Sequence, residues 1–242
     1  MGHTRPDWST YGKLETVFAL VDLGELAVRL GSIDTFDRAG NVIWMEDFER
    51  GRNNWETAVV GSGSAVVLTS EVAKSGEYAL KLTAGAATDR YAVVARGYPF
   101  RIQGKHGVEL SLAMVATAPV LTVRLENYDG TTLGYASLRY TPSTGTLAIL
   151  TGATTWTTIA AGINLYVGKY GFHTLKLVVD WANLKYVRLL LNHLVYDLSA
   201  HSVPSTTSAT ASFELVQVTV QPEVAATGVV YIDDVIVTIN ED

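Results

Sequence analysis

The residues of this chain best suited to chemistry are two groups of carboxylates near its two ends. Glu46-Asp47-Phe48-Glu49 comes early and Asp233-Asp234 comes late. The first and last strands of an antiparallel sandwich often lie side by side, so we expect the two groups to meet. Neighbouring residues of a strand face opposite ways, so the sequence leaves open whether Asp233 or Asp234 points inward.

These carboxylates do not have the spacing of a glycosidase. A retaining glycosidase needs two carboxyl groups about 5 Å apart across a cleft. Alternation along a strand places Asp47 and Glu49 on one face and Glu46 on the other. The chain also has no G-x-S-x-G sequence and no phosphate-binding glycine loop. We therefore predict no catalytic residues and a protein that is not an enzyme.

Histidine and cysteine provide no metal or nucleophile motif. The five histidines are not in H-x-x-x-H or H-E-x-x-H spacing, which argues against a zinc site. His173 falls on the face of Leu175 and Leu177, so we expect a hydrogen-bonded histidine in the core or at an edge. The chain has no cysteine, which excludes disulfides and thiol catalysis.

Aromatic residues in the middle of the chain are candidates for sugar binding, because exposed rings stack on the apolar faces of sugars. The alternative is that these rings fill the core or an interface. The sequence leaves open whether Tyr135 and Trp156 share a face. The candidate glycan-binding residues are Tyr128, Tyr135, Tyr140 and Trp156.

Composition narrows the class of partner. The chain has 242 residues, enough for one large β-sandwich or two small domains, and a net charge of -6, which argues against nucleic acid. Only 17% of residues are charged and 48% are apolar, which fits either a surface buried against another chain or a Thr-rich β-protein. Residues 14–30 are too short and too charged to span a bilayer, and no signal-peptide pattern is visible, so no membrane partner is expected.

The most regular part of the chain is an expected three-stranded meander. Phe172–Asp180 shows the period-2 alternation of a half-buried strand, and Leu184–Leu191 and Leu194–Leu198 follow it. Asn192-His193 stands where a two-residue hairpin turn needs positive φ at both residues. Turn signals separate the other expected strands, which are Val42–Met45, Ala65–Ser70, Tyr78–Thr83, Tyr91–Arg96, Val108–Ala116, Val120–Asn127, Thr132–Tyr140, Thr146–Leu150, Ala211–Gln221 and Val229–Ile239.

Many short strands with Gly- or Pro-bearing turns indicate a mainly β fold, an antiparallel β-sandwich, here with an N-terminal helical arm. We place the arm at residues 1–45 and the sandwich at 46–242. Residues 11–30 of the arm have a wide apolar side that must pack either on the sandwich or on another subunit. The predicted assembly interface on this helix is Val17, Leu20, Val21, Ala27 and Val28.

Four segments in order resemble jelly-roll carbohydrate-binding modules and concanavalin/laminin-G-like sandwiches. They are residues 47–55, which contain D-F-E-x-G and Trp55, then Glu71–Thr83, residues 172–199 and Val229–Thr238. Residues 8–49, which join a helical arm to such a sandwich, look like bacteriophage virion structural proteins.

The first resemblance implies a structural Ca²⁺, an ion that takes six to eight oxygen ligands. Its implied ligands are Glu49, Asp47, Ser75 and Asp233 or Asp234, with backbone near Lys74. The alternative is that these carboxylates cap turns or pair with Arg50, Arg52 or Lys74.

Two functional hypotheses follow. The first is a non-enzymatic subunit of a phage-like virion, a capsid decoration or tail-associated protein. It would form homo-oligomers or contact other particle subunits through its arm, on a virion or an extracellular surface assembly. The alternative is a carbohydrate-binding module that attaches to glycans or to a host surface.

Overall fold

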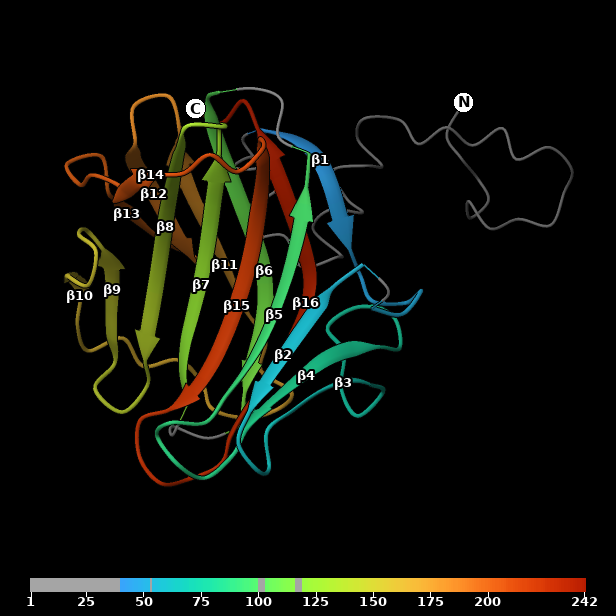
Figure 1. The fold of residues 1–242 in the computed structure, drawn as a ribbon. Coiled ribbons are helices and arrows are strands. Elements are labelled where there is room, and N and C mark those ends of the chain that lie inside the picture. Colours follow the sequence, from blue (N-terminus) through green and yellow to red (C-terminus); the bar gives the residue numbers. More distant parts are fainter. Residues whose placement is uncertain (1–39, 53, 100–102, 116–118) are drawn as a thin grey trace, which may run out of the picture. The chain divides into compact units, whose positions relative to one another are not determined.

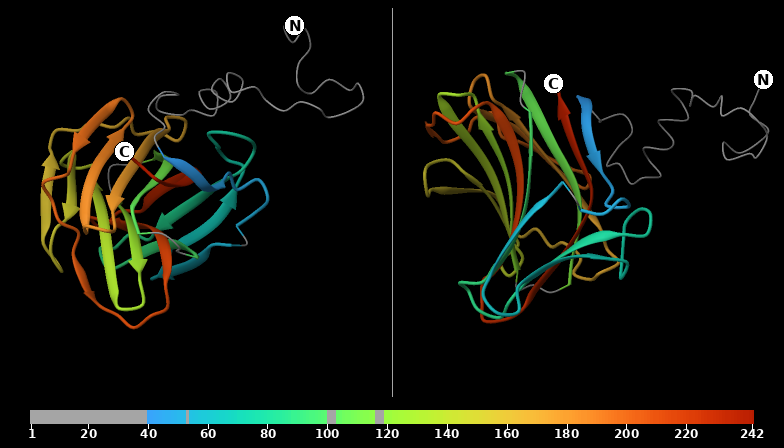
Figure 2. Two further views of the ribbon diagram at one scale, coloured as in Figure 1. Left: turned by 90° about the horizontal axis from the view of Figure 1, so that it is seen from above. Right: turned by 45° about the vertical axis from the view of Figure 1, so that its right-hand side comes forward.

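The computed structural model describes residues 40–52, 54–99, 103–115 and 119–242. The chain divides into residues 1–38 and a compact unit of residues 39–242. The described part of that unit consists of strands, turns and loops, without a helix, and its strands form two antiparallel sheets packed as a sandwich (Figures 1 and 2). The predicted helix and its five interface residues lie outside the described residues.

The first sheet, called sheet A here, has eight strands. Seven of them follow one path across the sheet, and β1 pairs with β16 beside that path. In spatial order the strands of sheet A are β13 (Leu194–Asp197), β12 (Lys185–Leu191), β11 (His173–Asp180), β6 (Lys105–Met114), β16 (Gly228–Ile239), β4 (Ala79–Ala84) and β3 (Ala65–Thr69), with β1 (Asn41–Glu46).

The second sheet, sheet B, also has eight strands, and its long central strands run side by side in Figure 1. β14 pairs with β8 beside the main path. In spatial order the strands of sheet B are β10 (Trp156–Ala160), β9 (Thr146–Leu150), β8 (Thr132–Thr141), β7 (Pro119–Tyr128), β15 (Phe213–Pro222), β5 (Tyr91–Tyr98) and β2 (Glu56–Val60), with β14 (Ser205–Thr207).

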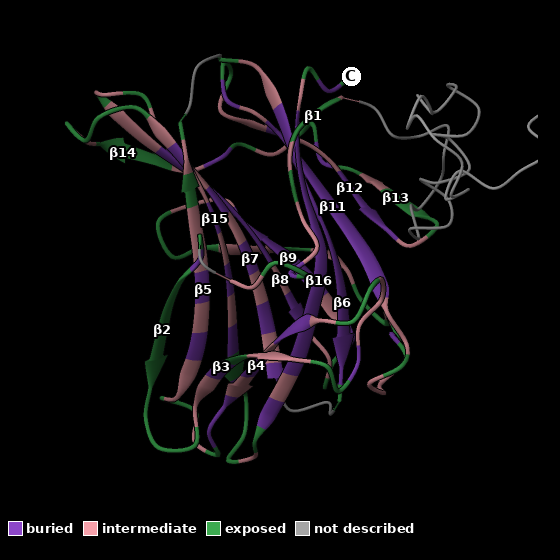
Figure 3. Cartoon of the chain, turned by 90° about the vertical axis from the view of Figure 1, so that its right-hand side faces the viewer, coloured by how far each residue is buried: buried purple, intermediate pink, exposed green. Residues whose placement is uncertain are grey.

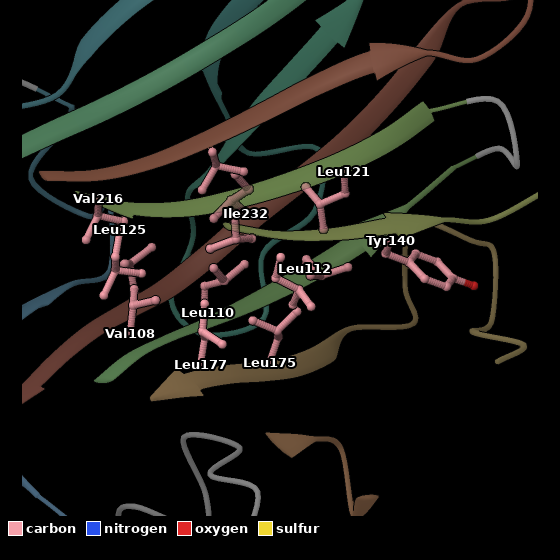
Figure 4. Close-up of a cluster of buried hydrophobic side chains, with 14 of the residues drawn as sticks. Val108, Leu110, Leu112, Leu121, Leu125, Tyr140, Leu175, Leu177, Val216 and Ile232 are labelled. Carbon is pink, nitrogen blue, oxygen red and sulfur yellow. The ribbon is translucent and has the colours of Figure 1, made fainter. Parts of the chain in front are cut away.

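Alternation along the strands of sheet B separates a core face from an outer face. In β7, buried residues such as Leu121 and Leu125 alternate with half-buried Thr122, Arg124 and Glu126. The buried set meets side chains of sheet A in a continuous apolar cluster (Figure 4). Because β7 and β15 keep this period, their polar side chains are collected on the outer face.

The first and last strands are neighbours, as expected. β1 pairs with β16 from Asn41↔Ile239 to Glu46↔Val235. Residues 41–46 therefore belong to the sandwich, and its start moves to about residue 39, ahead of the predicted boundary at residue 46. The apolar residues of β1 belong to a strand that pairs with β16 of sheet A. These residues are therefore part of the sandwich and not of the arm.

The expected meander is present, with one correction to its turn. β11, β12 and β13 are consecutive antiparallel neighbours in sheet A. Asn192 has a φ of 53°, but His193 is not among the described residues with positive φ. One residue of this turn, not two, therefore adopts the left-handed conformation.

Three strands were not predicted. β14 falls in a Ser/Thr-rich segment without apolar alternation, and β10 falls between two turn-rich segments. β2 is an edge strand exposed along its whole length (Figure 3). Short edge strands bury little apolar surface, so they lack the alternation that reveals longer strands. No helix of the described part is long and apolar enough to cross a bilayer.

Candidate functional site

The outer face of sheet B has a hollow of about 320 Å³. The hydrogen-bonded register across the sheet aligns Arg124 with Ser137 on one side and Gln217 on the other. Trp156 of β10 pairs with Leu150 of β9, so this row of neighbouring residues continues to the edge of sheet B. The hollow is lined by Thr122, Arg124, Ser137, Leu150, Ala153, Thr154, Trp156, Gln217 and Thr219.

The floor of the hollow is the place where β8 and β9 separate. Their register runs from Thr141↔Thr146 to Leu138↔Ile149 and stops before Ser137 and Leu150. Tyr186 of sheet A lies between these two residues instead. Its phenol donates to the Leu150 carbonyl at 2.7 Å and accepts from the Ser137 N–H at 2.9 Å. Burial raises the pKa of the Tyr186 phenol, so it remains a neutral donor.

Two arginines and two aromatic rings occupy the outer face around the hollow. The Arg139 guanidinium lies 4.2 Å from the centre of the Trp156 ring, and that of Arg124 lies 5.0 Å from the centre of the Tyr135 ring. Arg124 Nε also lies 2.8 Å from Glu126 Oε1. Burial lowers the pKa of Arg139, while Glu223 acts in the opposite direction. The stacked rings restrict the guanidinium groups to defined positions.

Three of the four predicted glycan-binding residues are on this face. Trp156 lines the hollow, and Tyr135 lies beside it on the same face, which answers the question that the sequence left open. Tyr128 is also on the outer face, but its ring stacks on Phe213 at 4.4 Å and its hydroxyl donates to Glu126. These contacts leave Tyr128 outside the lining of the hollow.

The fourth residue, Tyr140, requires a correction. Tyr140 is only 3% exposed, and its ring belongs to the apolar cluster between the sheets (Figure 4). Its hydroxyl donates to the Ile163 carbonyl at 3.0 Å. Tyr140 follows Arg139 in β8, so the two side chains face opposite ways, and Tyr140 cannot reach a ligand on the outer face.

The sequence analysis missed most of the polar lining. Thr122 and Arg124 are outward positions of β7, and Gln217 and Thr219 are outward positions of β15. Their alternation with apolar residues is visible in the sequence. Only the pairing of β7 with β15 shows that the two polar rows are adjacent.

Carboxylates from both ends of the chain contact one loop, residues 74–78. Asp233 Oδ2 accepts from the N–H groups of Lys74 and Ser75 at 2.7 and 3.1 Å, and Ser75 Oγ donates to Asp234 Oδ1 at 2.7 Å. Glu49 Oε1 accepts from two backbone N–H groups of the same loop, those of Glu77 and Tyr78. The predicted grouping of Glu49, Ser75, Asp233 and Asp234 around one loop is therefore present.

These carboxylates have hydrogen-bond partners within the protein. Backbone N–H groups donate to Asp233 and to Glu49. Asp47 accepts from the Glu49 N–H and caps a turn. In the described part of the chain, no three side chains of His, Asp or Glu gather as a metal site would require. Calcium at this loop stays a prediction.

A buried polar cluster lies between the sheets. Glu214 is fully buried, and its two oxygens contact His106 Nδ1 at 2.7 Å and Trp181 Nε1 at 2.9 Å. Burial, then the Glu214 carboxylate, raises the pKa of Tyr98 well above its usual value. Glu214 satisfies His106 and Trp181 inside the core, so we assign the cluster to stability.

No protein-family model matches this chain, and no curated protein matches its sequence. Solved structures do match. An endo-β-1,4-glucuronan lyase from the fungus Trichoderma reesei has a TM-score of 0.58 at 12% identity, over 82% of this chain and 96% of the lyase. The potassium-bound carbohydrate recognition domain of Emp46p has a TM-score of 0.53 at 10% identity, over 84% and 96%. The corresponding domain of Emp47p has a TM-score of 0.50 at 12% identity, over 83% and 97%.

These likenesses show the fold, which is an antiparallel β-sandwich of the kind found in carbohydrate-binding and lectin-like domains. The expected jelly-roll sandwich is therefore confirmed, while these comparisons give no support to the virion resemblance.

Proposed function

We propose that the outer face of sheet B binds carbohydrate without catalysis. The observation that carries the proposal is the hollow, in which the Trp156 ring stands beside the polar side chains of Thr122, Arg124 and Gln217. A sugar presents an apolar C–H face and a ring of hydroxyl groups. An aromatic ring with hydrogen-bonding side chains around it complements both.

The kinds of protein that share the fold support this proposal. Two of the matching structures are named as carbohydrate recognition domains, and the third is named for its action on a polysaccharide. The lining favours binding over hydrolysis, because none of the nine described lining residues is a carboxylate or a histidine. General acid–base chemistry on a glycosidic bond uses such groups.

The test is a carbohydrate screen of the full chain with a matched pair of variants. Trp156→Ala removes a ring from the hollow, whereas Tyr170→Ala removes a ring that is 76% exposed and does not line the hollow. We expect Trp156→Ala to lower affinity for the best ligand by about tenfold or more, and Tyr170→Ala to leave it unchanged. Equal affinity of the Trp156 variant and the parent protein would contradict the proposal.

The virion hypothesis remains a separate proposal. It depends on residues 1–45, most of which lie outside the described residues. Light scattering on the full chain and on a chain that starts at residue 39 tests it. A defined oligomer that becomes a folded monomer on truncation would support assembly through the arm, and two monomers would contradict it. Either result is compatible with carbohydrate binding on sheet B.

A further inference from the structure

Two arginine side chains, Arg124 and Arg139, lie at the hollow on sheet B and could bind a negatively charged group. Arg124 pairs directly with Ser137 of β8, and Arg139 lies two residues further along the same strand. The two arginines are therefore diagonal neighbours on one face, a relationship in which long side chains reach a common space. Both guanidinium groups lie on aromatic rings, which restricts them to this face.

The two arginines differ in their carboxylate partners. Glu126 is the carboxylate in ion-pair contact with Arg124, and it also accepts a hydrogen bond from Tyr128. No carboxylate of the described residues lies within ion-pair distance of Arg139, and Glu223 acts on it from further away. Of the two arginines, only Arg124 is in ion-pair contact with a carboxylate of the described residues, on a chain whose net charge is -6.

Arg139 also has hydrogen-bonding capacity that the protein does not use. Its Nε is buried and has no hydrogen-bond partner among the described residues. An N–H group that is removed from water and left unpaired is costly. A carboxylate bound beside the hollow would give Arg139 an anionic partner, because the planar guanidinium fork matches its two oxygens.

From these contacts we infer that the carbohydrate bound on this face is acidic, a glycan with uronic acid units. This inference rests on the proposed function and adds the chemical class of the ligand. The uronate carboxylates contact Arg139 and Arg124, and the sugar rings contact Trp156 and the polar lining. A neutral glycan would satisfy the ring contacts but leave Arg139 unpaired.

The experiment compares ligands that differ only at C6. Calorimetry on the full chain measures binding of β-1,4-glucuronate and β-1,4-mannuronate hexasaccharides against the matching glucose and mannose hexasaccharides. We expect at least one uronate to bind about tenfold or more tightly than its neutral partner, with affinity that falls as salt rises. Neutral ligands that bind equally or better would overturn the inference and leave the proposed function standing. No binding of any of the four at millimolar concentration would contradict both.

Three variants separate charge from folding. Arg139→Gln should weaken uronate binding about tenfold, while Arg50→Gln makes the same charge change outside the hollow and should have no effect. Glu126→Gln removes the competing carboxylate and should strengthen uronate binding, a gain that a damaged fold cannot imitate. Loss of uronate binding in Glu126→Gln, or unchanged binding in Arg139→Gln, would overturn the inference.

Discussion

The phenol of Tyr186 crosses the core of the sandwich and donates a 2.7 Å hydrogen bond to the carbonyl of Leu150 in the opposite sheet. Tyr186 itself is fully buried. Its hydroxyl satisfies backbone groups that β8 and β9 leave unpaired where they separate. A residue of sheet A thus supports the floor of the hollow on the far side of sheet B.

Tyr186→Phe should destabilise the protein and affect the hollow. The change leaves the Leu150 carbonyl and the Ser137 N–H without their partner, at a cost of about 1–3 kcal/mol in the free energy of unfolding. Urea denaturation measures this cost, and calorimetry should show weaker carbohydrate binding by the folded protein. Tyr170→Phe, at an exposed ring, is the control and should change neither quantity. Unaltered stability in Tyr186→Phe would show that water replaces the phenol.

Tyr135 and Tyr140 should respond differently to truncation, because they occupy opposite faces of β8. Tyr140→Ala removes a ring from the core and should lower the free energy of unfolding by about 3–5 kcal/mol. The remaining folded protein should bind carbohydrate normally. Tyr135→Ala removes the ring beneath Arg124 and should weaken acidic ligands several-fold with little loss of stability. The opposite pattern would mean that the faces are misassigned.

Asp233 should make stability depend on pH. Burial, and then the neighbouring Asp234 carboxylate, raises the pKa of Asp233 to about 7. Between about pH 4 and pH 7 the folded state keeps a proton that the unfolded state releases, so the free energy of unfolding falls as pH rises. The loss can reach about 4 kcal/mol, since each pKa unit corresponds to about 1.4 kcal/mol. Thermal unfolding in EDTA from pH 4 to pH 8 measures this trend.

Asp233→Asn is the matched variant, because an amide resembles the protonated carboxyl group. It should remove most of this pH dependence and be more stable than the parent protein at pH 8. The same samples test calcium. A rise in melting temperature with Ca²⁺ in the parent protein, absent in the variant, would support the calcium prediction. No rise at millimolar Ca²⁺ would contradict it.

Glu214→Gln tests the cluster between the sheets. The carboxylate contacts both His106 and Trp181 inside the core, and removal of one partner of a buried polar pair costs about 3–5 kcal/mol. Urea denaturation should show a loss of this order. Glu56→Gln, at an exposed position of β2, should be neutral within about 0.5 kcal/mol. A neutral Glu214 variant would mean that the amide replaces both contacts.

Most of this fold could be predicted from the alternation of apolar and polar residues in the sequence. The central strands, the meander from His173 to Asp197 and the adjacency of first and last strands all follow from period-2 patterns and their order. A buried face imposes that pattern on a strand, so long half-buried strands can be recognised locally. β2 and β14 bury too little to carry it, and the sequence did not reveal them.

The site was decided by tertiary structure. The sequence placed Trp156 and Tyr135 among the candidates, but it could not show that they share a face with Arg124, Arg139 and Gln217. It also put Tyr140 among the sugar-binding residues, because an inward and an outward tyrosine look alike in a sequence. Which polar side chains become neighbours depends on the register between paired strands, and some of these strands, such as β7 and β15, are far apart in the sequence. The sequence alone does not show that register. The hollow itself depends on Tyr186, which reaches it from the other sheet.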